Sequence, residues 1–336
     1  MKIHKLYLTA FALVLAGVSG GVSAIVSAAP TPTVTNSQNT VKISPVRSDL
    51  SIAPGKTGTA TVRVTNLSKA KMELQVIEND FVDGNKEDGT PRLVLDADKF
   101  APSHSLKRYM VPVKNVVIEA GKDADITVTI NVPKDAKAGG YYGALRFQPV
   151  NVEGGANGGV DASAATLILL TVPGPMTEKM DVLEYNVYQG QATNSWFQSA
   201  NDLSLKLRVV NMGSAHVAPM GQITVKNGDK VVDTINFNQE KPQNVVLPDG
   251  KRTWDVPLKN IGSFGHYTVE GVISYGSKNN TLNLTKSFWV IPVYVIAIAI
   301  GGTVLLVLLI VGIFLFLRSY KKRILGGGGR RGGYRR

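Results

Sequence analysis

Few residues in this sequence could carry out chemistry, and none of them forms a complete catalytic set. Ser68 and Lys71 have the Ser-x-x-Lys spacing of an acyl-transfer site, in which the lysine removes the proton of the attacking serine. That chemistry needs both side chains on one face of a helix, whereas the alternating residues on either side predict a turn between strands. The sequence has no Gly-x-Ser-x-Gly elbow, phosphate loop or dinucleotide fingerprint. We therefore expect that the protein is not an enzyme.

Metal and cofactor binding have equally little support. Residues 79–89 (NDFVDGNKEDG) could offer carboxylates to calcium, but Lys86 lies among them and the spacing differs from a helix-flanked calcium loop. A solvated hairpin turn is the favoured interpretation. His104, His216 and His266 have no partner at i+2 or i+4, which favours loop or strand-surface positions over metal ligation. The absence of cysteine excludes disulfides, thiolate zinc sites and thiol nucleophiles. We predict no metal and no cofactor.

The net charge of +12 comes from the two ends of the chain. Residues 1–29 hold two basic groups and residues 318–336 hold eight, with no acid in either segment, which leaves 27 basic and 25 acidic groups between them. The nearly neutral middle, residues 30–317, does not offer a basic groove, so no nucleic acid is expected as a partner of this part of the chain.

The first end has the three-part layout of a secretory signal peptide. The basic start Met1–Lys5 is followed by the apolar stretch Leu6–Val18 and then by small residues. Val26-Ser27-Ala28 offers small side chains where a signal peptidase reads, so we assign residues 1–28 to the signal peptide. An uncleaved anchor is the alternative, because no charge appears between Lys5 and Lys42.

The second apolar run, Phe288–Leu317, contains no charge and predicts a transmembrane helix over residues 289–317. Even from Pro292 it has 26 residues, or about 39 Å as a helix, which exceeds the ~30 Å hydrocarbon layer. The expected membrane-interface residues are Trp289 and Tyr294 on the outer side, and Arg318, Lys321, Lys322 and Arg323 on the inner side. This basic flank predicts a cytoplasmic C-terminus and extracellular domains.

Residues 318–336 form a basic tail rich in glycine and arginine. Such composition is found in RNA-binding segments, but a positive anchor against acidic lipid head groups is the favoured interpretation beside a membrane.

The middle of the chain predicts two β-domains. Alternation such as Ala60, Val62 and Val64 indicates half-buried strands, and turn signals such as Asp83-Gly84 separate them. Ala165–Val172 is nearly continuous and apolar, which predicts a last strand buried on both faces, with the glycine-rich stretch Glu153–Gly159 as a hairpin loop before it. The boundary near residues 173–175 gives domains at 41–172 and 176–288. The predicted fold class is all-β: two tandem immunoglobulin-like β-sandwiches followed by one transmembrane α-helix.

The two domains look like diverged copies. Val116–Lys122 (VVIEAGK) corresponds to Val245–Lys251 (VVLPDGK), and each is followed by a strand and then by a Gly-x-Tyr motif ending at Tyr142 or Tyr267. We expect each tyrosine to pack at a sandwich corner with its hydroxyl bonded to backbone.

Several short motifs carry a resemblance to a known family. They are the segments 43–45 (ISP), 52–55 (IAPG), 62–66 (VRVTN), 138–144 (AGGYYGA) and 169–174 (LLTVPG), and the segment 288–292 (FWVIP) resembles the entry to the membrane helix in related bacterial proteins. Together with the layout, they resemble the WxL-interacting cell-surface proteins of Gram-positive bacteria. None of the three tryptophans begins a Trp-x-Leu motif, so the chain resembles the anchored partner type.

The resemblance implies a peptidoglycan-associated first domain and a membrane-anchored binding or scaffolding role. Its partners would be the cell membrane and either peptidoglycan, as a cell-wall polymer, or another surface protein. A membrane-tethered assembly chaperone with two immunoglobulin-like domains is the alternative, although chaperones of that kind are normally free and the apolar helix argues against it.

Overall fold

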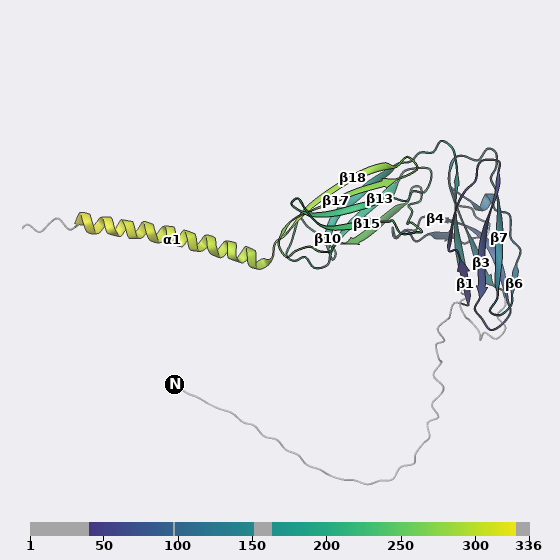
Figure 1. Cartoon of the computed structure of the whole chain (residues 1–336), viewed down its shortest axis with the longest axis horizontal. Coiled ribbons are helices and arrows are strands. Elements are labelled where there is room, and N and C mark those ends of the chain that lie inside the picture. The colour runs from purple at the N-terminus through teal and green to yellow at the C-terminus, as the bar shows by residue number, and fades with distance from the viewer. Residues whose placement is uncertain (1–39, 97, 151–162, 327–336) are drawn as a thin grey trace, which may run out of the picture. The chain divides into compact units, whose positions relative to one another are not determined.

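The computed structural model of the chain describes residues 40–96, 98–150 and 163–326 (Figure 1). The predicted signal peptide, the glycine-rich loop and the last part of the basic tail lie outside these residues. The described part contains two β-sandwiches and one long helix, so the fold class predicted from the sequence is confirmed.

The first sandwich pairs a three-stranded with a six-stranded sheet. The small sheet has the order β1 (Val41–Ser44), β3 (Thr57–Asn66) and β7 (Asp123–Asn131). The large sheet has the order β2 (Arg47–Ser51), β9 (Ala164–Val172), β8 (Gly139–Pro149), β4 (Met72–Val82) and β5 (Arg92–Val94), and β6 (Val116–Ile118) also pairs with β4. A short 3-10 turn, η1, covers Lys107–Tyr109.

The second sandwich repeats this plan with four and five strands. Its first sheet has the order β11 (Ala192–Thr193), β10 (Met180–Gln189), β13 (Leu203–Asn211) and β16 (Lys251–Pro257). Its second sheet has the order β12 (Trp196–Phe197), β18 (Asn280–Val290), β17 (Gly265–Tyr275), β14 (Met220–Asn227) and β15 (Lys230–Phe237).

In both sandwiches the first segments pair with two different sheets, which is an immunoglobulin-like arrangement. In the first sandwich β1 runs antiparallel to β3, and the next segment, β2, runs parallel to β9. In the second, β10 runs antiparallel to β13 while β12 runs parallel to β18. The corresponding strands pair in the same sense, as expected for diverged copies.

Alternating apolar residues build the two cores. Val62 and Val64 of β3 lie against Ile126 and Val128 of β7 in the first core, with the residues between them facing solvent. Leu205, Leu207 and Val209 of β13 repeat this pattern in the second core. Burial of these side chains is the main stabilising contribution, at about 1.5–3 kcal/mol for each large apolar side chain.

Strand β9 is buried on both faces, as its continuous apolar run predicts. Ile168, Leu170 and Val172 point into the core of the first sandwich. Leu167 and Leu169 point to the opposite side of the sheet, where they join a separate apolar cluster. The second side of this sheet therefore also needs a covering partner.

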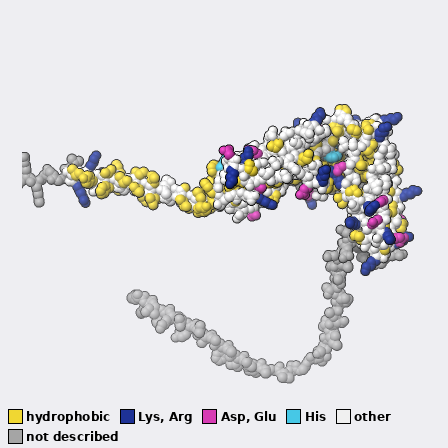
Figure 2. All heavy atoms as spheres, in the orientation of Figure 1, with side chains coloured by type: hydrophobic (Ala, Val, Ile, Leu, Met, Phe, Trp, Pro, Cys, Tyr) yellow, Lys and Arg dark blue, Asp and Glu magenta, His cyan; other side chains and the backbone are white. Residues whose placement is uncertain are grey.

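The long helix α1 covers Val293–Gly326, and its segment Val293–Ile324 is apolar and long enough to cross a membrane. None of its most apolar window is buried by protein, and Figure 2 shows hydrophobic side chains along its exposed length. The helix begins four residues later than predicted, because Trp289 and Val290 belong to β18 and Pro292 lies between strand and helix. Proline is favoured where a helix begins, because its missing N–H would be unpaired there.

Candidate functional site

The candidate site lies where the two sandwiches meet, on the outer side of the β9–β8–β4–β5 sheet. Phe81, Tyr142 and Leu169 form an apolar cluster there with Leu247, which comes from the second sandwich. The rings of Phe81 and Tyr142 are 5.7 Å apart. Residues more than a hundred positions apart in the sequence thus share one apolar cluster.

Polar contacts hold the same junction. Arg208 donates two hydrogen bonds to the Glu87 carboxylate, at 2.6 and 2.7 Å. The Thr253 N–H donates to the Glu87 carbonyl at 2.7 Å, and the Gly140 N–H donates to the Ser214 carbonyl at 2.9 Å. The hydrogen bonds from Arg208 lower the pKa of Glu87. The ion pair therefore stays charged well below neutral pH.

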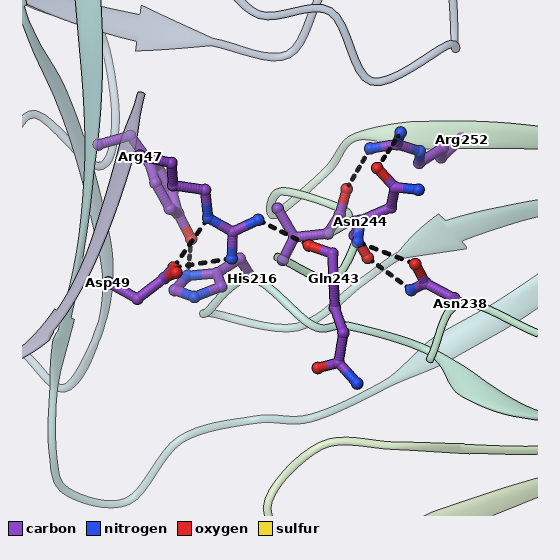
Figure 3. Close-up of polar contacts among 9 residues, drawn as sticks. Arg47, Asp49, His216, Asn238, Gln243, Asn244 and Arg252 are labelled. Carbon is purple, nitrogen blue, oxygen red and sulfur yellow. Dashed lines mark hydrogen bonds and ion pairs between the residues drawn. The ribbon is translucent and has the colours of Figure 1, made fainter. Parts of the chain in front are cut away.

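A second group of contacts positions the loop 242–247 of the second sandwich (Figure 3). The Arg47 guanidinium bonds to Asp49 and also donates to the Gln243 carbonyl at 2.7 Å. Arg252 donates to the Val245 carbonyl at 3.1 Å and to the Asn244 side chain at 2.9 Å. One arginine from each sandwich thus fixes this loop against the sheet.

Residues of both sandwiches line a cavity of about 520 Å³ that is open to solvent. Its apolar lining consists of Val46, Phe81, Pro91, Leu93, Ala165, Leu167, Leu169, Pro242, Val245 and Leu247. Its polar lining includes Arg47, Asp83, Thr90, Gln243 and Arg252. The Arg252 Nε atom is buried without a hydrogen-bond partner, and burial lowers the pKa of this guanidinium. The cavity can therefore accept an apolar group that carries a hydrogen-bond acceptor beside it.

The serine and lysine spaced for acyl transfer do not form a catalytic pair. The Ser68 hydroxyl lies 2.6 Å from the Asn66 Oδ1 and 2.9 Å from the Ala70 carbonyl, and it can donate its one proton to either oxygen. Lys71 instead lies 3.3 Å from the Glu119 carboxylate. Both residues belong to the turn after β3, as the sequence predicts, and Ser68 stabilises that turn.

The acidic stretch 79–89 leads into the predicted hairpin, because β4 pairs antiparallel with β5 and Asn85, Lys86 and Asp88 in the loop are exposed, but its first residues are not solvated. Asn79 and Asp80 belong to β4 and are fully buried. Asp80 accepts hydrogen bonds from the Ala101 and Lys107 N–H groups, both at 2.8 Å. Because two backbone donors compensate for the buried carboxylate, burial is tolerated. Glu87, at the other end, contacts the second sandwich, and no group of three potential metal ligands occurs among the described residues.

The three histidines have different environments. His104 Nδ1 lies 2.6 Å from the Gly140 carbonyl, and His266 is exposed, with its ring packed at a tilt against that of Trp289. His216 lies in the loop between β13 and β14, as predicted, but its ring is half-buried in the junction, with its Nδ1 3.4 Å from the Tyr142 hydroxyl. Burial lowers the pKa of His216 to about 4.

The predicted membrane-interface residues flank the apolar part of α1. Trp289 ends β18 and is exposed, and Tyr294 lies in the first turn of the helix. Arg318, Lys321, Lys322 and Arg323 lie in the last turns of the helix rather than in a separate tail.

Sequence reasoning missed the residues that form the junction. Arg47, Arg208 and Arg252 have no local pattern that separates them from ordinary strand residues. The signal that could have located the junction is the outward pair Leu167 and Leu169, because apolar residues on both faces of one strand require two covering layers.

No protein-family model matches the chain, and no curated protein matches it. Among solved structures it is similar to the class 5 fimbriae chaperone CfaA, with 14% identity, a TM-score of 0.39, and 74% of this chain and 98% of that chain covered. The E. coli chaperone DraB gives 12% identity, a TM-score of 0.33, and coverage of 75% and 96%. The Acinetobacter baumannii CsuC–CsuE complex gives 10%, 0.35, and coverage of 74% and 98%. These similarities are too low to support a shared function.

Proposed function

We propose that this chain is a single-pass membrane protein that holds two sandwiches outside the cell and binds another surface protein through the cavity between them. The apolar helix α1 supplies the anchor, and its basic last turns favour a cytoplasmic C-terminus. The observation that carries the binding role is the apolar cavity at the junction, lined by both sandwiches.

The lining favours a protein partner over a cell-wall polymer. Glycan strands are rich in hydroxyl groups and need many hydrogen-bond partners, whereas this cavity offers mostly leucine, valine, proline and phenylalanine side chains. An extended peptide segment with an apolar side chain matches this lining, and a neighbouring backbone carbonyl could bond to the free Arg252 Nε.

Site-specific photo-cross-linking of the full chain in its own cells tests this proposal. Leu93 lines the cavity, so a cross-linker placed there should give one discrete protein adduct. Val272 is a matched control, because it is an exposed aliphatic residue on a strand of the second sandwich and does not line the cavity. Adducts at Leu93 that muramidase digestion removes would instead assign the cavity to cell-wall polymer. Equal products at both positions would overturn the cavity as a binding site.

A membrane-tethered assembly chaperone is the second candidate, and the same open apolar cavity favours it, since an unfolded subunit exposes apolar side chains. Pulse-labelling separates the two functions. A chaperone should cross-link only to newly made subunits and then release them, whereas a scaffolding protein should keep its adduct partner throughout the chase.

A further inference from the structure

The end of the second sandwich that leads into α1 carries a row of exposed rings. Trp289 of β18 lies opposite Trp196 of β12 on one side and His266 of β17 on the other. Trp196 is 44% exposed and Trp289 is 45% exposed, and the centroid of the His266 ring lies 4.6 Å from that of Trp289, with the two rings tilted by 36°. Three separate segments thus place aromatic rings side by side across one sheet.

Phe264 adds a fourth ring at the same end. It precedes Gly265, which lies opposite Val290, and its side chain is 54% exposed. Elsewhere on the outer face, β18 presents only the polar residues Thr281, Asn283, Thr285 and Ser287. The change from polar to aromatic residues is therefore confined to the end nearest the helix.

The chain between this row and the helix is short and fixed. The Ile291 N–H donates to the Phe197 carbonyl at 2.8 Å, Pro292 is buried, and α1 begins at Val293. Val293 is four positions after Trp289, so their Cα atoms are at most about 14 Å apart. The rings must therefore lie close to wherever the helix enters a bilayer.

The length of the helix places its first turn outside the hydrocarbon layer. The uncharged stretch from Val293 to Leu317 spans about 37 Å, which exceeds the ~30 Å layer. With Arg318 at the inner boundary, the first turn and Tyr294 fall among the head groups, where indole and phenol rings are favoured.

The segments that carry the rings also lack acidic residues. Residues 189–201, 259–268 and 286–297 contain Lys259 and Lys286 but no aspartate or glutamate. The surface potential of an anionic leaflet attracts lysine and repels carboxylates. Two aspartates border these segments: Asp202 follows the first of them, and Asp229 in the neighbouring β14–β15 turn is followed directly by Lys230, which offsets its charge.

We propose that Trp196, Phe264, His266 and Trp289 form a membrane-docking surface that rests in the lipid head groups around α1. The inference rests on the proposed membrane anchor and adds that the second sandwich itself contacts the bilayer. The occupant is the head-group layer of the membrane that α1 enters. Only two residues connect β18 to α1, which leaves no room for another protein between the four rings and the bilayer.

Single-cysteine labelling of the full chain in phosphatidylcholine–phosphatidylglycerol vesicles tests this surface, since the natural sequence has no cysteine. We place an environment-sensitive fluorophore at Ser263→Cys beside Phe264, at Val272→Cys and at Tyr294→Cys. Lipid with a nitroxide on its head group is the quencher. Val272 lies on the same strand and face as His266 but about 20 Å further along, so it is the matched control.

The expected result is strong quenching at positions 263 and 294 and at least threefold weaker quenching at 272. Adding Trp196→Ser and Phe264→Ser should lower the quenching at 263 towards that at 272, with unchanged circular dichroism. Quenching at 294 without excess quenching at 263 would overturn the docking surface alone. Absence of quenching at 294 would overturn the membrane anchor, and the docking surface with it.

Discussion

At the scale of single residues, two buried asparagines show how similar the sandwiches are. The Asn66 side chain, at the end of β3, donates to the carbonyls of Ala70 and Ile118 at 2.8 and 3.0 Å. The Asn211 side chain, at the end of β13, donates to those of Ala215 and Val246 at 2.8 and 2.9 Å. Each oxygen accepts the N–H two residues later. Each asparagine thus closes its own turn and ties it to a second segment.

We expect Asn66→Ala and Asn211→Ala each to lower the free energy of unfolding by about 2–4 kcal/mol, because buried carbonyl groups lose their donors. Guanidinium denaturation of the full chain in detergent measures this change. Asn283→Ala is the control, since Asn283 is exposed on β18 and should cost less than about 0.5 kcal/mol. Equal effects at the three positions would show that the asparagines are not structural.

His216 should make the junction sensitive to acid. Burial lowers the pKa of its imidazole to about 4, whereas the unfolded chain titrates near 6.5. Between these values the unfolded state binds the additional proton, so stability is complete above pH 6.5 and falls as pH decreases towards 4. We expect a loss on the order of 1–3 kcal/mol over this range. His216→Gln should flatten the profile, whereas His266→Gln, at an exposed ring, should not.

At the scale of elements, periodicity predicted the strands well because each strand has one face on a core. Alternation in β3, β7 and β13 and the continuous apolar run of β9 predict strands where the structure has them.

The alignment of the two copies by their sequences differs by one residue from their alignment in the structure. The turn residue with positive φ is Gly121 in the first copy and Asp249 in the second, one position away from the match of the glycines in the sequence. Aspartate tolerates that conformation, which hides the correspondence from sequence inspection.

The boundary between the second sandwich and α1 gives a prediction about truncation. A chain that ends at Pro292 keeps Phe288 and Val290, which are buried in the second core, and should remain soluble and resistant to protease. A chain that ends at Lys286 loses both side chains and about 3–6 kcal/mol of apolar burial. Limited proteolysis and guanidinium denaturation of the two truncations measure the difference. Equal stability would mean that the end of β18 does not contribute to the sandwich.

At the scale of the whole molecule, Leu167 and Leu169 could indicate that the first sandwich needs a covering partner, but the partner residues at the junction could not have been predicted from sequence. Glu87 and Arg208 are 121 positions apart, and each occurs in a stretch that reads as ordinary exposed strand or turn. Only the assembled sandwiches bring the two side chains together, and the cavity beside them exists only in that assembly. Local patterns determine each sandwich, whereas the binding site depends on contacts between them.

The junction should make the two sandwiches unfold as one unit. The Glu87–Arg208 pair is only about one-third exposed and has two hydrogen bonds, so reversing one charge costs more than at a surface pair. We expect one calorimetric transition for the native chain and two for Glu87→Lys. The charge swap Glu87→Lys with Arg208→Glu should restore one transition.

The Lys226–Glu270 pair, which lies within the second sandwich, provides the matched comparison. Because that pair does not bridge the sandwiches, Glu270→Lys should lower the transition temperature without dividing the transition. Two transitions already present in the native chain would mean that the contacts at the junction are too weak to couple the domains. The cavity would then open and close with their relative motion instead of being held in shape.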